Sequence, residues 1–120
     1  MIAPRVVIAA LSSLLTVGGA LAHPVPKSAT PKPNAVLAAS PAEVRIGFSE
    51  GLVAAFSGME VDDASGNAVV TGTATVDAHD ARVLILAVTA KLGPGLYTVK
   101  WHAVGDDTHH VSGHYSFQVT

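Results

Sequence analysis

The stretch GLYTVKWHA at residues 95–103 alternates apolar and polar side chains from Tyr97 onward. Such alternation is typical of a β-strand with one buried face, because successive side chains point to opposite sides of a strand. The stretch HYSFQV at residues 114–119 repeats the arrangement, with Tyr115, Phe117 and Val119 on the inward face. Residues 43–48, EVRIGF, alternate in the same way. These three stretches predict a β protein.

Turn-forming residues separate the expected strands at short intervals. Clusters rich in Gly, Pro, Asp and Asn lie at residues 62–67, 77–80 and 93–95. The first cluster is flanked by apolar stretches at residues 56–61 and 68–76, a pattern that predicts a hairpin. No stretch of the mature chain shows helical periodicity. About seven short strands at roughly ten-residue spacing therefore indicate an all-β fold, an antiparallel Greek-key sandwich or barrel of the immunoglobulin-like kind.

The first 22 residues have the organisation of a secretory signal peptide. A short basic start precedes an apolar run at residues 6–15, and the segment ends with the small-x-small sequence ALA at residues 20–22. This end predicts cleavage between Ala22 and His23. The alternative, a membrane anchor, needs about 20 apolar residues, and two glycines at residues 18–19 interrupt the run. We therefore expect export to the bacterial periplasm and removal of this segment.

Export would leave one mature domain at residues 23–120. Its first part, residues 23–35, contains four prolines and is expected to be an extended arm, because proline is incompatible with a helix interior. Removing residues 1–22 leaves six basic against nine acidic residues, without basic runs, which argues against a nucleic-acid partner. The chain has no cysteine, so a metal site would have to use histidines and carboxylates. We expect a monomer that does not insert into a membrane after cleavage.

Residues suited to metal coordination lie at both ends of the mature domain. His23 would be the first residue, and the candidates near the end are Asp106, Asp107, His109, His110 and His114. The ends of distant strands meet at one rim of a sandwich, so the two groups could converge. A free amino-terminal histidine can chelate a metal ion through its α-amine and its imidazole Nδ1, and an Asp-x-His turn can add a nitrogen and an oxygen. Such a tetragonal set of nitrogen and oxygen ligands suits Cu(II).

The candidates near the end of the chain are not equivalent. Asp107 is favoured over Asp106 by its spacing to His109. His110 follows directly on His109 and would point the other way along an extended chain. His114, on an outward strand face close to the same rim, stays an alternative.

Pro24 and the predicted cleavage restrict how His23 could bind. Proline has no backbone N–H, so Pro24 cannot supply the deprotonated amide that other amino-terminal copper motifs use, whereas chelation by amine and ring remains open. Before cleavage, the nitrogen of His23 is an amide and cannot coordinate. His79, in a turn between two aspartates, is expected to be a solvated surface residue.

Several stretches together resemble the CopC copper-resistance proteins of the bacterial periplasm. They cover essentially the whole mature chain in the right order: His23 at the predicted cleavage site, KSATP at residues 27–31, VRIGFSE at 44–50, GLYTVKW at 95–101 and DTHHVSG at 107–113, with Phe117. The resemblance implies a seven-stranded Greek-key sandwich of cupredoxin-like plan that is not an enzyme. It also implies sequestration or carriage of copper and its delivery to an inner-membrane transporter of the CopD type.

The resemblance also implies the ligands of one Cu(II) ion per chain. His23 would give its amine and Nδ1, His109 a second imidazole and Asp107 a carboxylate, while Glu50 would lie beside the site and orient ligands by hydrogen bonding. Some relatives carry a methionine-rich Cu(I) site, but the corresponding residues 51–70 contain only Met59. The chain is therefore expected to be of the Cu(II)-only type.

Two other functions were weighed against copper carriage. A copper ion held by an amino-terminal histidine also occurs in lytic polysaccharide monooxygenases, but the chain is short and has few aromatic residues to form a polysaccharide-binding face. A metal-free immunoglobulin-like interaction module would make the histidines and aspartates incidental. Neither Ser49-Glu50 nor Ser112-Gly113 belongs to a nucleophile elbow or a recognisable catalytic triad.

Overall fold

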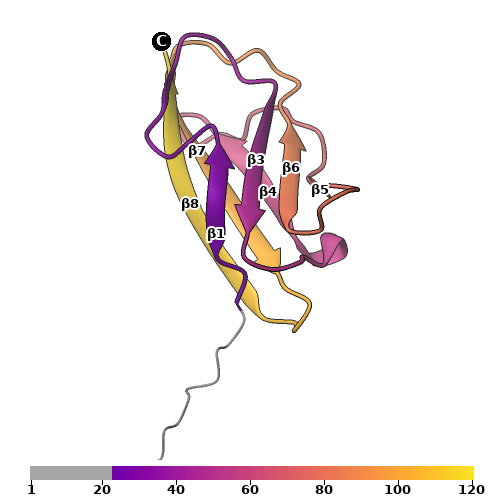
Figure 1. Ribbon diagram of the computed structural model, residues 1–120. Helices are drawn as coiled ribbons and strands as arrows, with labels where there is room; N and C mark the ends of the chain where they lie inside the picture. Colours follow the sequence, from indigo (N-terminus) through magenta and orange to yellow (C-terminus); the bar gives the residue numbers. More distant parts are fainter. Residues whose placement is uncertain (1–22) are drawn as a thin grey trace, which may run out of the picture.

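The computed structural model describes residues 23–120, which form a sandwich of two β-sheets (Figure 1). The predicted signal peptide lies outside the described residues. One sheet has the order β1-β3-β6-β5, with β1 (Pro26–Thr30), β3 (Glu43–Phe48), β6 (Val83–Ala87) and β5 (Thr75–Val76). The other has the order β2-β8-β7-β4, with β2 (Val36–Leu37), β8 (His110–Val119), β7 (Gly95–Val104) and β4 (Gly58–Asp62). A single 3-10 turn, η1 (Ala54–Phe56), separates β3 from β4.

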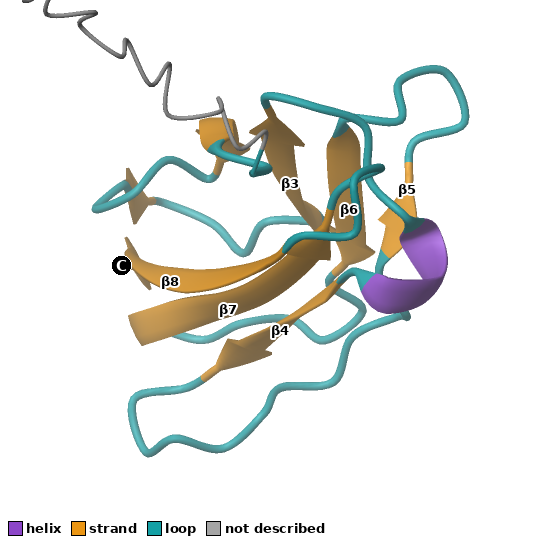
Figure 2. Ribbon diagram, turned by 90° about the horizontal axis from the view of Figure 1, so that it is seen from below, coloured by secondary structure: helices purple, strands orange, loops and turns teal. Residues whose placement is uncertain are grey.

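The long pair β7 and β8 forms the centre of one sheet. The two strands are antiparallel and stay in register from Gly95 opposite Val119 to Val104 opposite His110. Most of their inward side chains are buried as the alternation predicts, and Val99 and Phe117 have almost no exposed surface. Trp101 and Tyr115 are partly buried and pack against the core. The facing sheet contributes Val44, Ile46, Leu84 and Leu86 to the same core. Figure 2 shows the two sheets packed face to face, which confirms the predicted all-β sandwich.

The described residues form eight strands rather than seven, and the expected hairpin after residue 62 is only partly made. Asp62 and Ala68 form an isolated bridge, and Val69 N donates to Val61 O. The chain then leaves β4 and crosses to the other sheet, where Gly72 N donates to Ala87 O beside the end of β6. Strand β2 is a two-residue addition that runs parallel to β8, an exception to the predicted antiparallel pairing.

The proline-rich arm is extended, and part of it belongs to a sheet. Residues 26–30 form β1, which pairs antiparallel with β3 and places Ala29 opposite Ile46. The register shifts between Pro26 and Ser28, so the irregularity lies where a proline opens the strand. Pro24 is fully buried. The arm is therefore fixed against the sandwich from its second residue.

Candidate metal centre

The loop between β7 and β8 presents two of the predicted ligands. It is closed by hydrogen bonds from Thr108 N to Gly105 O (2.9 Å) and from Gly105 N to His109 O (3.2 Å). Thr108 has a φ of 68°, a left-handed conformation that is uncommon for a β-branched residue and marks a constrained turn. Asp107 Oδ1 accepts from the backbone N of His109 (3.2 Å), and Asp107 Oδ2 lies 2.8 Å from its Nδ1.

The contact between Asp107 and His109 orients the imidazole. With Nδ1 facing the carboxylate, Nε2 is the ring nitrogen left free for a metal ion. The same contact lowers the pKa of Asp107, because the hydrogen bond from His109 stabilises the charged carboxylate. Both side chains are partly exposed, so an ion could reach them from solvent.

His23 approaches this loop from the other end of the described chain. Its ring centroid lies 5.6 Å from that of His109, edge to face. Ser49, at the end of β3, holds the backbone around it: Ser49 Oγ donates to His23 O (3.3 Å) and accepts from Val25 N (2.9 Å), and Ser49 N donates to Val25 O (2.8 Å). Together with the buried Pro24, these bonds fix the position of an exposed histidine. The predicted convergence of the two ends therefore occurs.

Glu50 lies beside the loop, and one of its carboxylate oxygens lacks a partner. Oε1 is buried and makes no hydrogen bond. The side chain lies over Gly105, where a Cβ atom would overlap it. Burial raises the pKa of Glu50, and the negative charges of Asp107 and Asp106 raise it further, while His109 opposes the rise. The centre therefore gathers negative charge that an added cation would neutralise.

These donors fit a copper ion in kind, although they are not arranged as a finished site. Two imidazoles, carboxylate oxygens and an unpaired buried oxygen form a nitrogen and oxygen set without thiolate, as Cu(II) prefers. Within residues 23–120, no three His, Asp or Glu side chains are already placed to hold a metal ion together. In the full chain, the nitrogen of His23 is bonded to residue 22, so it is not the free amine that chelation through amine and ring needs.

The remaining candidates have other neighbours in the structure. Asp106 faces Gly51, where an added Cβ would lie 2.7 Å from Oδ2. His110 begins β8, opposite Val104, and His114 lies opposite Lys100 further along the strand, both exposed. Met59 pairs with Trp101 and packs against the core.

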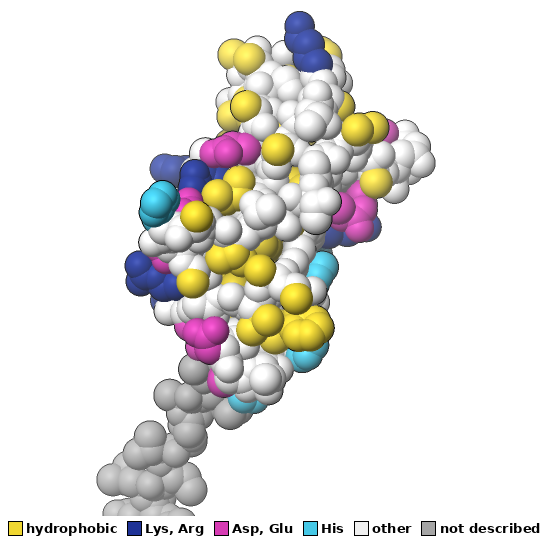
Figure 3. Space-filling model, turned by 90° about the vertical axis from the view of Figure 1, so that its right-hand side faces the viewer, with side chains coloured by type: hydrophobic (Ala, Val, Ile, Leu, Met, Phe, Trp, Pro, Cys, Tyr) yellow, Lys and Arg dark blue, Asp and Glu magenta, His cyan; other side chains and the backbone are white. Residues whose placement is uncertain are grey.

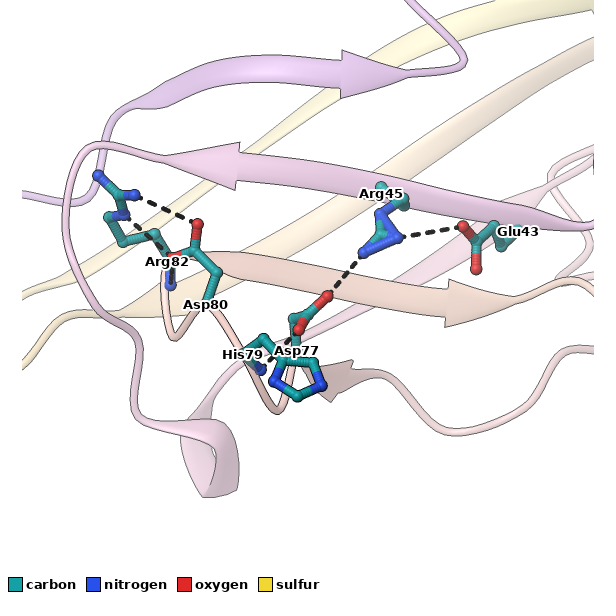
Figure 4. Close-up of polar contacts among 6 residues, drawn as sticks. All are labelled: Glu43, Arg45, Asp77, His79, Asp80 and Arg82. Carbon is teal, nitrogen blue, oxygen red and sulfur yellow. Dashed lines mark hydrogen bonds and ion pairs between the residues drawn. The ribbon is translucent and has the colours of Figure 1, made fainter.

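His79 belongs to a turn held by ion pairs (Figure 4). Its backbone N donates to Asp77 Oδ1 (2.7 Å), and Arg45 lies 2.7 Å from Asp77 Oδ2. Arg82 contacts both carboxylate oxygens of Asp80. These contacts lower the pKa of Asp77 and of Asp80. His79 itself is exposed, as the sequence predicts.

Ser49 and Gly105 are the two residues at this centre whose roles sequence reasoning missed. Ser49 was considered only as a possible nucleophile, whereas its hydroxyl holds the chain around His23. Gly105 leaves the space that the Glu50 carboxylate occupies. The sequence signal that could have found Ser49 is its position directly before the acid in VRIGFSE. No sequence pattern indicates the role of Gly105.

The chain matches known proteins over nearly the whole described region. The family model described as the CopC domain matches residues 26–120. Protein YobA of Escherichia coli K12 is 34% identical over 96% of this chain and 93% of its own length. Copper transport protein CutJ of Bacillus subtilis is 28% identical over 82% of this chain, but only 18% of CutJ is covered.

Two crystal structures have the same fold. CopC from Methylosinus trichosporium OB3b superposes with a TM-score of 0.75 at 35% identity, covering 81% of this chain and 93% of that one. PcoC, titled a methionine-rich copper resistance protein from Escherichia coli, gives 0.74 at 33% identity, covering 82% of this chain and 100% of that one. No helix among the described residues is long and apolar enough to cross a membrane. The shared fold, the extent of the sequence match and the family model agree with one another. The chain therefore belongs to the CopC family.

Proposed function

We propose that the processed protein is a periplasmic Cu(II) carrier that holds one ion with His23, His109 and Asp107. Membership in the CopC family makes copper the ion to expect. The free amine and Nδ1 of His23, Nε2 of His109 and an oxygen of Asp107 would form the tetragonal set that Cu(II) favours. Glu50 would orient these ligands by hydrogen bonding.

The observation that carries the proposal is the approach of two histidines from opposite ends of the described chain. Their ring centroids are 5.6 Å apart, and Asp107 fixes the ring of His109 from the other side. Removal of residues 1–22 would turn the amide of His23 into an amine a short distance from this pair. In the folded domain both rings are already positioned, so little ordering would remain to oppose binding.

The shortage of sulfur ligands supports Cu(II), rather than Cu(I), as the bound ion. Cu(I) prefers thiolate and thioether ligands, and the chain has no cysteine and only Met59 outside the predicted signal peptide. PcoC, described as methionine-rich, differs in this respect. Met59 is partly buried against the core and offers one thioether at most.

Delivery to a membrane transporter of the CopD type completes the proposal. A carrier needs an accessible site, and His23, Asp107 and His109 are all exposed. CutJ, named a copper transport protein, contains a segment similar to this chain within a much longer sequence. The presence of a CopC-like segment within a copper transport protein supports an encounter between this chain and a copper transporter. CopC proteins are binding proteins, so the oxidative enzyme considered from the sequence is not retained.

The test is a Cu(II) titration followed by EPR on protein beginning at His23 and on a form with one extra residue before it. We expect tight binding with a nitrogen-rich tetragonal signal in the first form and much weaker binding in the second. Equal binding by both would remove the amine from the site. His79→Ala is the matched control, because this exposed histidine lies in a turn held by Asp77 and should leave the titration unchanged. No binding by any form would refute the proposed function.

A further inference from the structure

An exposed apolar patch lies beside the metal centre, formed by residues 53–56, which include η1. None of the side chains of η1 is buried, and Phe56 is 62% exposed. In Figure 3, which shows the side of the molecule where η1 lies, a compact group of hydrophobic side chains appears near the lower end with a histidine next to it. An exposed aromatic side chain within a contiguous apolar group is a feature of interaction surfaces.

The backbone that carries this patch is held in place by its neighbours. Val53 N donates to Val104 O (2.8 Å). Ser57 Oγ donates to Val53 O (2.9 Å) and accepts from Val104 N (3.1 Å), so it links both ends of η1 to the end of β7. A patch on a fixed backbone loses little conformational entropy when it docks. Phe56 is therefore exposed without belonging to a loose loop.

The patch and the metal centre share one rim of the sandwich. Leu52 forms a bridge with Gly105, the first residue of the loop that carries Asp107 and His109. Gly51 packs against Asp106. Figure 1 shows η1, the β7–β8 loop and the start of β1 at the same end of the molecule. A partner that covers residues 53–56 would consequently face the metal ligands.

The charge of this rim decides which kind of partner fits. Elsewhere, Asp62, Asp77 and Asp80 each contact a lysine or arginine. Within the described part of the chain, no lysine or arginine forms an ion pair with Glu50, Asp106 or Asp107. An acidic rim is repelled by anionic lipid headgroups, which attract basic segments instead. The same rim complements a protein surface that carries basic side chains.

We propose that residues 53–56 are the docking surface for the protein that accepts copper, with Phe56 inserted into an apolar pocket bordered by basic side chains. This inference rests on the proposed carrier function and names the surface through which the ion is handed over. Docking at the patch places the acceptor over the ligands, and the acids that are not proposed copper ligands, Glu50 and Asp106, set its orientation. Association should weaken as salt is added, because the attraction between the rim and a basic surface is screened.

The experiment compares Phe56→Ser with Val36→Ser in the processed, copper-loaded protein. Val36 is a matched control, since it is similarly exposed (64%) but lies in β2, where it pairs with Gln118. The probe is the CopD-type transporter of the same organism, purified in detergent. Binding is measured by biolayer interferometry, and copper transfer is measured by loss of the EPR signal of the carrier. Phe56→Ser should weaken binding and slow transfer by about tenfold or more, with unchanged Cu(II) affinity, while Val36→Ser should match the wild type.

The outcomes separate the docking surface from the carrier function. If Phe56→Ser and Val36→Ser bind the transporter equally well, or if the wild type does not bind it, the docking surface is wrong whatever the copper titration shows. Phe56-dependent binding to protein-free vesicles of phosphatidylglycerol and phosphatidylethanolamine would replace the protein partner with a lipid surface and overturn the proposal. Phe56-dependent binding to the transporter without copper transfer would support the surface and refute the hand-over.

Discussion

Replacing Gly105 by alanine should disturb the candidate metal centre without replacing any of its proposed ligands. The new Cβ atom would overlap Glu50 Oε1 and lie 3.1 Å from Asp107 Oδ1. The backbone cannot easily retreat, because Gly105 donates to His109 O and accepts from Thr108 N. The Glu50 carboxylate must therefore move, or the turn must open.

The cost can be worked from this crowding. Adding a methyl group to a packed position costs about 1–3 kcal/mol, since neighbouring groups must leave their preferred positions. For a domain of this size, each kcal/mol lowers Tm by about 4–8 °C. We expect Gly105→Ala to lose stability in this range and also to bind Cu(II) more weakly, because Asp107 and Glu50 are displaced together.

Circular dichroism during heating, followed by a Cu(II) titration, measures both effects on protein that begins at His23. Gly72→Ala is the control, because its Cβ would lie 3.6 Å from Ala87 Cβ and 3.8 Å from Ala87 O, both ordinary contacts. Adding Glu50→Ala to Gly105→Ala should recover most of the lost stability, since the overlapping atoms are then gone. A Gly105→Ala variant as stable as Gly72→Ala would refute this reasoning, and so would a double variant that recovers nothing.

Two further predictions concern the surroundings of the same rim. Because the pKa of Glu50 is raised, its carboxyl group holds a proton more tightly in the folded protein than in the unfolded chain. The contribution of this proton to stability is complete below about pH 4.5 and is lost as pH rises through the pKa of the folded protein. Copper-free Glu50→Gln should therefore be more stable than the wild type at pH 7 in urea unfolding, with an advantage that shrinks below pH 4.5; an advantage independent of pH would contradict this. Ser57→Ala removes the link between Val53 O and Val104 N and should cost about 1–3 kcal/mol. It should also increase hydrogen exchange in residues 53–56, and unchanged exchange would show that the link does not hold the patch.

The parts of the fold that sequence predicted well are those in which burial alternates along a paired strand. Tyr97, Val99 and Ala103 are buried on the inward face of β7, and Phe117 faces Tyr97 across the strand pair in a stacked contact. Such a pattern is a property of each strand and can be recognised locally.

The connections were predicted less well, because their course depends on distant partners. Residues 68–76 have the composition of a strand, yet they cross between the sheets, with Gly72 bonded to Ala87 and only Thr75–Val76 in β5. The parallel pairing of β2 with β8 likewise joins the arm to the far end of the chain. No local pattern contains that information.

At the candidate metal centre, too, the chemistry of the residues could be predicted from the sequence, whereas the placement of His23 could not. The chemistry of His23, Asp107 and His109 can be recognised in the sequence, and the contact between Asp107 and His109 follows from their spacing in a tight turn. The placement of His23 depends on Ser49 and on the burial of Pro24, both of which become apparent only when β1 is seen paired with β3.

Copper binding by His23 and His109 would link the stability of the arm to the metal ion. A ligand that binds only the folded state stabilises it by RT ln(1 + [L]/Kd), or about 4 kcal/mol at a thousandfold excess over Kd. With His23 and His109 as ligands, that stabilisation would act between the start of the mature chain and the β7–β8 loop. The rings of His23 and His109 are in edge-to-face contact between these two segments, and Ser49 holds the arm to the end of β3. Loss of copper to an acceptor would release this constraint, so the arm should be better protected from hydrogen exchange in the loaded protein than in the copper-free one.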